Sequence, residues 1–284
     1  MIASIFHRLE YTYDQEVSLG PQIIYLYPKP DRFCEMLEIN LGVFPTPSKL
    51  SIHLDAEGNT QQIALFEEPT NYLNVELQAK IKLETLNPFD FYFVPKEAQK
   101  LPMKYDPEQK RVLGPYFMNE TISAELMVLS NNLFSKVKAQ TSAFLMEVNN
   151  YIFTEFTYEI REEGNANLPG YTLWQKRGSC RDFAVLFSAI CQAQGLATRY
   201  ASGYYVGHSP VQVPDQSHNL HAWVEVYLPG GGWCGYDPTQ NEVVCGNHIA
   251  LATSYDLNII APLSGYFCGD GQSRLHTKVD IKII

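Results

Sequence analysis

The chain lacks the long apolar run that a transmembrane helix requires. No window of the sequence contains 18 uncharged apolar residues in succession. Near the amino terminus, His7, Arg8 and Glu10 would interrupt the apolar stretch of a signal peptide. We therefore expect a soluble, cytoplasmic protein with no membrane partner.

Basic residues are scarce. The chain has 21 Lys and Arg residues against 31 Asp and Glu residues, which gives a formal net charge of −10. It also lacks a basic stripe or a run of lysines that could meet a phosphate backbone. The composition argues against nucleic acid as a partner.

The sequence also lacks the cysteine spacings and short motifs that indicate disulfide frameworks, metals or cofactors. The six cysteines form no CxxC pair and no dense framework, which favours reduced thiols over a secreted disulfide protein. The sequence contains no GxSxG elbow, phosphate loop, HExxH motif or calcium loop. We expect no cofactor.

Residues 1 to about 115 have the pattern of β-strands. Apolar and polar residues alternate over residues 5–14 and again, without a break, over residues 73–84. Two further runs, 50–54 and 62–66, flank a turn at Ala56-Glu57-Gly58-Asn59, which predicts a hairpin. Short strands with proline and glycine between them indicate a β-sandwich, and nothing in this half suggests catalysis.

The pattern changes after a connection at about residues 95–118, which contains four prolines. Apolar residues then follow helical spacing over residues 144–153 and 183–190, and Gly195 is placed to end the second helix. Strand signals return at 198–206, 222–228, 232–237 and 277–284. With 284 residues, 45% of them hydrophobic, we predict two domains. They are a β-sandwich at residues 1–118 and, at 119–284, an α+β domain with helices packed on an antiparallel sheet.

Cys180 lies where a loop should end and a buried helix begin. Ser179 is the expected N-cap residue, and the Asp182 carboxylate could bond back to it as in a capping box. Free N–H groups and the positive end of the helix dipole favour a thiolate at this place. Gly178 would leave room for a substrate near the sulfur. Because a free cysteine is most often a small buried hydrophobe, the assignment needs a base nearby.

His221 and Asp237 are the candidate base and its orienting carboxylate. They lie on two runs joined by Pro229-Gly230-Gly231, which predicts an antiparallel hairpin. With a loop of three residues, 228 pairs with 232 and Asp237 shares a face with His221. A loop of two or four residues would put Asp237 on the other face. Taken alone, either residue is more often structural, a surface histidine or a turn-forming aspartate.

At this point the sequence resembles a known family. Gly178-x-Cys180-x-Asp182-Phe183-Ala184, His221-x-Trp223-x-Glu225, Gly232-Trp233 and Asp237-Pro238-Thr239 are similar to the core motifs of bacterial transglutaminase-like proteins, often described as cysteine proteases. The resemblance implies a papain-like cysteine peptidase core behind a β-sandwich. It implies Cys180 as nucleophile, His221 as base and Asp237 as orienting group. In related transglutaminases an upstream aromatic residue helps to hold the oxyanion, and Trp174 and Tyr158 are the candidates here.

These motifs predict acyl transfer on a peptide or protein amide through a thioester. We expect Trp223 to wall the cleft and, with Gly178 and Trp174, to contact substrate. One alternative is a binding module that retains the peptidase fold without catalysis. Another is a metal site built from Cys234, Cys245 and His248, or from His208, His218 and His221. Neither set has the spacing of a known finger or metallohydrolase, so we expect no metal. The sequence does not fix the oligomeric state.

Overall fold

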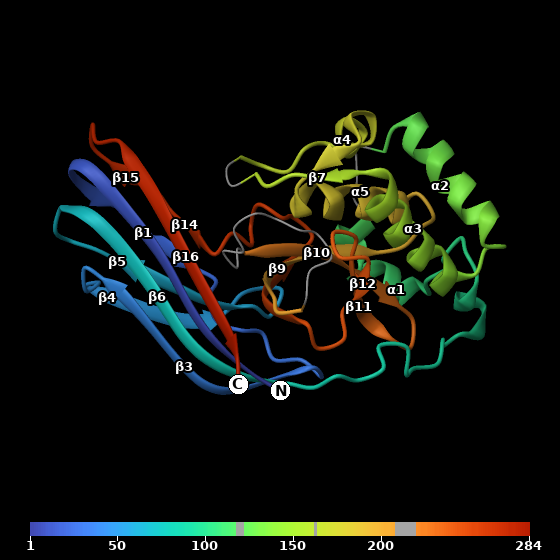
Figure 1. Cartoon of the computed structure of the whole chain (residues 1–284), viewed down its shortest axis with the longest axis horizontal. Coiled ribbons are helices and arrows are strands. Elements are labelled where there is room, and N and C mark those ends of the chain that lie inside the picture. The colour runs from blue at the N-terminus through green and yellow to red at the C-terminus, as the bar shows by residue number, and fades with distance from the viewer. Residues whose placement is uncertain (118–121, 162–163, 208–219) are drawn as a thin grey trace.

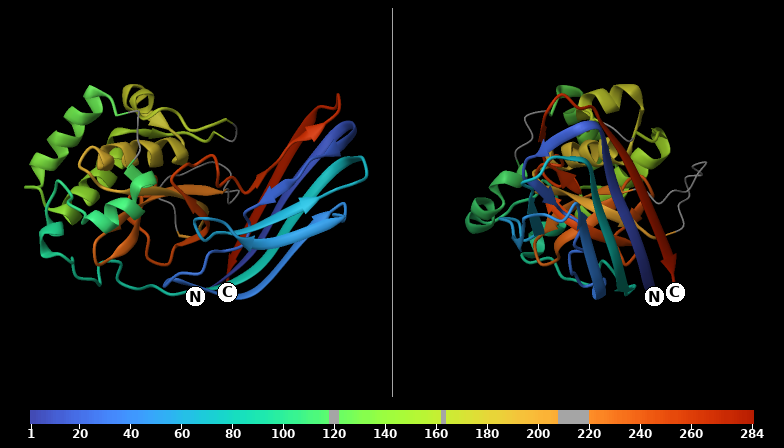
Figure 2. Two further views of the ribbon diagram at one scale, coloured as in Figure 1. Left: turned by 180° about the vertical axis from the view of Figure 1, so that it is seen from behind. Right: turned by 90° about the vertical axis from the view of Figure 1, so that its left-hand side faces the viewer.

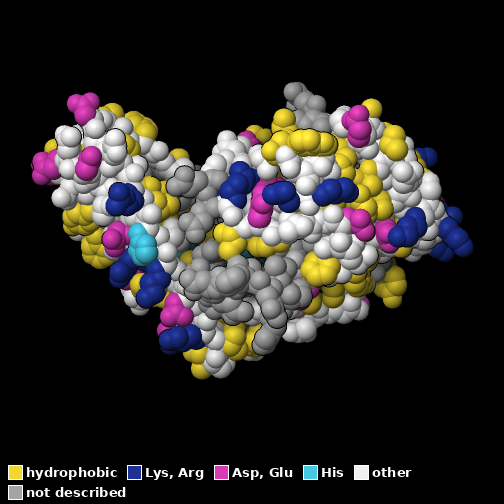
Figure 3. Space-filling model, turned by 45° about the horizontal axis from the view of Figure 1, so that its top comes forward, with side chains coloured by type: hydrophobic (Ala, Val, Ile, Leu, Met, Phe, Trp, Pro, Cys, Tyr) yellow, Lys and Arg dark blue, Asp and Glu magenta, His cyan; other side chains and the backbone are white. Residues whose placement is uncertain are grey.

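The computed structural model of the chain describes residues 1–117, 122–161, 164–207 and 220–284. Two antiparallel β-sheets form one half of the molecule, and a third sheet with the helices forms the other (Figure 1). A notch separates the two halves on the face that Figure 3 shows. The fold is α+β, with a β-rich first part, as the sequence predicted.

The first half has two sheets that share one core. The larger sheet has the order β15-β1-β6-β3, with β16 also paired to β1, and the smaller has the order β14-β2-β5-β4. The strands from the start of the chain are β1 (Ile2–Leu19), β2 (Gln22–Ile24), β3 (Cys34–Phe44), β4 (Lys49–Leu54), β5 (Thr60–Leu65) and β6 (Thr70–Leu83). Those from its end are β14 (Leu263–Ser264), β15 (Phe267–Cys268) and β16 (Ser273–Ile283).

The alternation that predicted strands has the expected physical basis. Along β6, Leu73, Val75, Leu77 and every second residue to Leu83 are buried, whereas the intervening polar side chains reach solvent. The predicted hairpin is also present, because β4 and β5 pair in antiparallel register up to Leu54 and Thr60. Both predictions are confirmed.

The last strand joins the first half of the molecule. We expected residues 277–284 to belong to the sheet of the second half, and this expectation is wrong. β16 pairs with β1 along most of its length, from Ala3↔Ile283 to Tyr13↔Ser273, and Figure 2 shows the two side by side. Val279 and Ile281 thereby enter the core of the sandwich. A period of two specifies a strand but not the edge with which it pairs.

The third sheet carries the predicted site. Its order is β12-β11-β10-β9-β13, from β9 (Thr198–Tyr205), β10 (His221–Leu228), β11 (Gly232–Asp237), β12 (Glu242–Val243) and β13 (His248–Ser254). Two short strands, β7 (Thr157–Tyr158) and β8 (Arg177–Gly178), pair with each other in parallel.

The helices of the second half include three that we had not predicted, α1, α2 and α4. The helices are α1 (Pro107–Val112), α2 (Ala124–Lys136), α3 (Thr141–Glu155), α4 (Pro169–Gln175) and α5 (Cys180–Gln192), with 3₁₀ turns at Lys96–Gln99 and Gly114–Phe117. In the described part of the chain, no helix combines the length and apolar character needed to cross a membrane.

The third sheet separates two hydrophobic cores. Ala201, Tyr204 and Trp223 belong to the core of the sandwich, whereas Val224 and Val226 belong to the core under α2, α3 and α5. Neighbouring residues of β10 therefore face opposite layers, as strand geometry requires. The division of the chain at residues 118 and 119 stays a prediction.

The tip of the β4–β5 hairpin is bonded to β13 across the junction of the two halves. Asn59, which is fully buried, accepts from the Thr253 N–H and donates to the Thr253 carbonyl, each at 2.9 Å. Lys29 Nζ donates to Asn59 Oδ1 at 2.8 Å and to Thr253 Oγ1 at 2.9 Å. The first half thus holds the backbone of β13 in place.

Candidate active site

Cys180 is the first residue of α5, and the loop before it is fixed by a buried carboxylate. Asp182 Oδ2 accepts from the Ser179 N–H at 2.8 Å and from the Ser179 hydroxyl at 2.9 Å. Its Oδ1 accepts from Arg161 Nη2 at 2.6 Å and from the Asn167 N–H at 2.7 Å. Asp182 therefore joins the start of the helix to the loop that follows β7.

Gly178 is buried, and its lack of a side chain serves packing. A Cβ at this position would lie 2.7 Å from Cβ of Asp182. The residue also pairs with Tyr158 in the short parallel sheet. The structure thus gives a second reason for a glycine here, while its contact with substrate stays a prediction.

The hairpin that carries His221 and Asp237 has the register needed to bring them together. Leu228 pairs with Gly232, so the loop takes three residues, and Val224 pairs with Tyr236. His221 Nε2 lies 2.7 Å from Asp237 Oδ2. His221 is 8% exposed and Asp237 is fully buried, so water scarcely competes for this bond.

Cys180, the first residue of α5, lies near His221 of β10, and that histidine acts on the pKa of its thiol. Burial alone would raise the pKa of the Cys180 thiol, but the hydrogen bond and charge of His221 and the Ala222 N–H outweigh it. The pKa of Cys180 is therefore lowered. Since Nε2 of His221 bonds to Asp237, Nδ1 is the ring nitrogen left for the sulfur.

The pKa values of His221 and Asp237 also result from burial opposed by neighbouring charges and hydrogen bonds. Burial would lower the pKa of His221, but Asp237 and Cys180 raise it to about 10. Burial would raise the pKa of Asp237, yet the charge and hydrogen bond of His221, together with the hydrogen bond from His248, hold it well below its usual range. The site therefore favours a thiolate, an imidazolium and a carboxylate in a row.

His248 is a member of the cluster that we had not placed there. It begins β13, a strand absent from our predictions, and its Nε2 lies 2.9 Å from Asp237 Oδ2. The sequence signal was a histidine at the start of an apolar run, which by itself indicates no partner.

His221, Asp237 and His248 could supply three metal ligands. One ligand atom from each lies within 4.8 Å of the others. In the structure these atoms bond to one another instead. Among the described residues, Cys234, Cys245 and His248 form no ligand cluster, and the Cys234 thiol donates to the Gly231 carbonyl instead. The second set includes His208 and His218, which lie outside the described residues.

Aromatic residues surround the two histidines. The Trp223 ring stacks on His221 with centroids 6.3 Å apart and meets His248 edge-on at 5.0 Å. The half-buried Tyr205 ring lies 6.0 Å from His221 and 5.0 Å from His248. Trp223 is only 1% exposed, so in this state it supports His221 from the interior. Its predicted contact with substrate stays untested.

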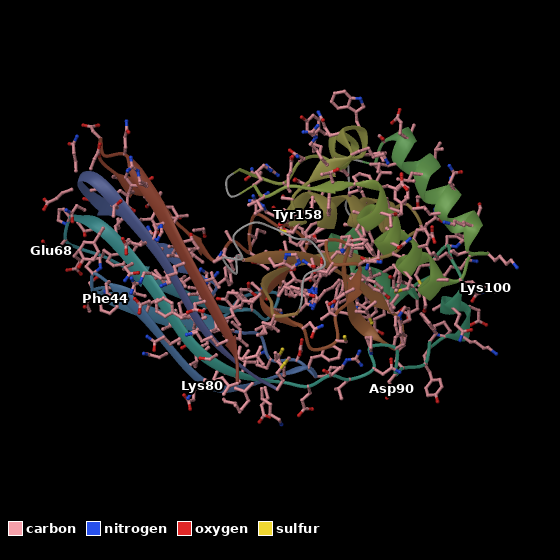
Figure 4. The ribbon with its side chains drawn as sticks, viewed as in Figure 1. Phe44, Glu68, Lys80, Asp90, Lys100 and Tyr158 are labelled. Atoms are coloured by element: carbon pink, nitrogen blue, oxygen red, sulfur yellow. The ribbon has the colours of Figure 1, made fainter. Side chains whose placement is uncertain are left out.

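The two aromatic candidates for the oxyanion lie in different surroundings. Trp174, on α4, is 74% exposed, and its ring contact is with Tyr171. Tyr158 pairs with Gly178, two residues before Cys180, and burial followed by the charges of Cys180 and Asp237 raises the pKa of its hydroxyl. Figure 4 shows Tyr158 on the side of the second half that faces the sandwich. Of the two, Tyr158 is the residue near the sulfur.

The fold and the site define a transglutaminase-like class of protein with a papain-like thiol centre. The family model of the transglutaminase-like superfamily matches residues 129–238, and that of the bacterial transglutaminase-like N-terminal region matches residues 3–82. The chain is therefore a bacterial transglutaminase-like protein.

Relatives in bacteria match between under half and nearly all of the chain. An uncharacterized protein of Mycobacterium leprae is 34% identical over 110 residues, which are 38% of this chain and 39% of that protein. An uncharacterized protein of Mycobacterium tuberculosis is 25% identical over 98% of this chain and 91% of its own length. A protein-glutamine gamma-glutamyltransferase of Pseudomonas aeruginosa is 27% identical over 45% of this chain and 20% of its own.

The fold extends over the whole chain in one solved structure, that of a candidate cysteine protease from Cytophaga hutchinsonii. It has a TM-score of 0.72 at 20% identity and covers 100% of this chain and 91% of its own. At this identity the similarity establishes the fold.

Proposed function

We propose that the protein is an enzyme that transfers the acyl group of a peptide or protein amide to Cys180, with His221 as base and Asp237 as orienting group. The 2.7 Å bond from His221 to Asp237, with Cys180 near the same histidine at the start of α5, is the observation that carries the proposal. Nucleophile, base and orienting group in contact are the general requirement for such catalysis.

In the first step the Cys180 thiolate attacks the amide carbonyl. A carbon–sulfur bond forms, and the carbonyl electrons move to oxygen. The N–H groups in the first turn of α5 have no partner within the helix, so they can stabilise this oxyanion. The Tyr158 hydroxyl is the side-chain candidate for the same role, because Tyr158 pairs with Gly178 just before Cys180.

In the second step the carbon–nitrogen bond breaks. Nδ1–H of His221 donates its proton to the departing amine, which leaves a thioester on Cys180 and a neutral imidazole. Water or a second amine then attacks the thioester and gives its proton to His221, so that the thiolate and imidazolium are restored. The steps balance without a cofactor.

The glutamine side-chain amide is the substrate class we propose to test first, since the Pseudomonas aeruginosa relative is named for transfer from glutamine. Hydrolysis and transfer to an amine differ only in the acceptor that reaches the thioester. Both reactions use the same three residues.

The test is to trap the acyl-enzyme. The protein is incubated with a glutamine-containing peptide library and a labelled primary amine, and Cys180 is examined by peptide mass spectrometry. We expect an adduct on Cys180 equal to the peptide minus ammonia, and either deamidated or amine-labelled product. Cys180→Ala is expected to give neither, and Cys268→Ala, which removes an exposed thiol, to give both. Peptide binding without any adduct or product would favour a non-catalytic binding module instead.

A further inference from the structure

His248 has a backbone that cannot move freely. It pairs with Tyr205 of β9, and the Cys34 thiol of the first half donates to its carbonyl at 3.4 Å. The residue is 1% exposed. Further along β13, Thr253 is bonded to the buried side chain of Asn59. A side chain on this strand is therefore held by both halves of the molecule.

The two oxygens of Asp237 have different partners. Oδ1 accepts from two backbone N–H groups, Thr239 at 2.9 Å and Gln240 at 3.3 Å. Oδ2 accepts from two side chains, His221 at 2.7 Å and His248 at 2.9 Å. His248 thus bonds to the very oxygen that orients the proposed base.

The proton on the His248 ring can be assigned from its partners. An ionised carboxylate only accepts hydrogen bonds, so Nε2 of His248 must be the donor. Among the described residues, Nδ1 of His248 is buried and has no partner. A proton there would be a buried donor without an acceptor, which costs more than an unused lone pair. His248 therefore serves Asp237 as a neutral donor.

We propose that His248 is a positioning residue: its Nε2–H holds Asp237 Oδ2 toward His221 and so maintains the thiolate on Cys180. This inference rests on the proposed function, in which that thiolate is the nucleophile. His248 does not touch the sulfur and acts through Asp237 alone.

The charged and titratable groups around the His248–Asp237 bond determine whether loss of this bond favours or opposes protonation of the Cys180 thiolate. They are Asp237 on β11, His221 on β10, Tyr205 on β9 and, behind the Tyr205 hydroxyl at 3.1 Å, Glu242 on β12. The row of thiolate, imidazolium and carboxylate has a net negative charge. A donor at Oδ2 stabilises this charge, so its removal favours protonation of the thiolate.

The experiment compares two amides of different reach. The amide nitrogen of glutamine lies as many bonds from Cα as Nε2 of histidine, whereas that of asparagine corresponds to Nδ1. We measure the rate of Cys180 alkylation by iodoacetamide between pH 4 and 9 in wild type, His248→Gln and His248→Asn. The acid limb of the profile should move up by about one pH unit in His248→Asn, with about tenfold slower alkylation on that limb. His248→Gln should stay within about twofold of wild type, because it retains the donor.

Controls separate positioning from stability. His276, which is exposed on β16, provides the matched substitution His276→Asn, for which we expect the wild-type profile. If His248→Asn fails to fold, His248→Phe, which keeps a ring beside Tyr205 and Trp223 but has no donor, replaces it. The inference is overturned if the donor-free variant has the wild-type profile, or if His248→Gln loses as much as His248→Asn.

The assay also distinguishes the two proposals, since alkylation needs no substrate. A shifted acid limb in a protein that converts no amide would remove the proposed function and leave the inference standing. Conversion of an amide by the wild-type protein, together with an unshifted acid limb in His248→Asn, would support the proposed function and overturn the inference about His248. A wild-type profile equal to that of the exposed Cys268 would overturn the inference, because no stabilised thiolate would exist to maintain.

Discussion

Replacement of Asp182 by alanine should both destabilise the protein and slow the reaction of Cys180. The carboxylate is fully buried and accepts four hydrogen bonds, from the N–H and hydroxyl of Ser179, from Arg161 and from the Asn167 N–H. Its removal leaves an arginine and two N–H groups without their acceptor.

The loss of stability expected for Asp182→Ala depends on how far the Arg161 side chain is exposed to water. Removing one member of a buried ion pair costs about 3–5 kcal/mol, because the other charge is left uncompensated. The Arg161 side chain is 29% exposed and can be hydrated after the change, which places the effect at about 3 kcal/mol. For a chain of this size, that corresponds to a melting temperature roughly 6–12 °C lower.

Two measurements on one sample test the reasoning. Thermal unfolding gives the stability, and iodoacetamide labelling below the melting transition gives the reactivity of Cys180. We expect labelling to slow, because Ser179 and the first turn of α5 lose their anchor. The matched control is Asp270→Ala, an exposed carboxylate, expected within about 0.5 kcal/mol of wild type. If Asp182→Ala proves as stable and as reactive as that control, the assignment of Asp182 as the anchor is refuted.

Three further predictions follow from charge and burial. Cys180 should be labelled faster than the exposed Cys268 below pH 8, since its lowered pKa keeps it ionised until the pH falls through that value, and equal rates would contradict the ion pair. Burial lowers the pKa of His7 to about 4, so the folded state binds fewer protons than the unfolded state between pH 6.5 and 4. Stability should fall by about 3 kcal/mol as the pH drops through this window, and denaturant titrations of His7→Phe should show a flatter dependence. Tyr158→Phe should lower kcat about tenfold or more with little change in KM if its hydroxyl holds the oxyanion, whereas an unchanged kcat would leave that role to backbone N–H groups.

The local pattern of the sequence predicted much of the site. The residues at 179, 180 and 182 form a helix start because a cap, a free N–H and a returning carboxylate are all local features. The placement of Asp237 beside His221 followed from the sequence only on the condition of a three-residue loop, which the pairing of Leu228 with Gly232 meets. Both deductions required only residues close together in sequence.

Contacts between distant segments were not predictable in this way. His248 reaches Asp237 because β13 pairs with β9, and no period in the sequence specifies that pairing. The partner of β16 escaped prediction for the same reason. Helix α4 was missed because its seven residues are too few for a clear period. The cytoplasmic location and the absence of nucleic-acid and membrane partners stay predictions from composition.

The pairing of β16 with β1 makes the half that contains the helices an insertion within the sandwich. During synthesis β1 leaves the ribosome long before β16. One edge of β1 therefore stays unpaired until the intervening residues have been synthesised. A strand edge left open in this way is prone to pair with another chain. Expression of the first 118 residues alone should therefore yield aggregates, whereas joining residue 83 directly to residue 263 would supply the missing strand in the same polypeptide.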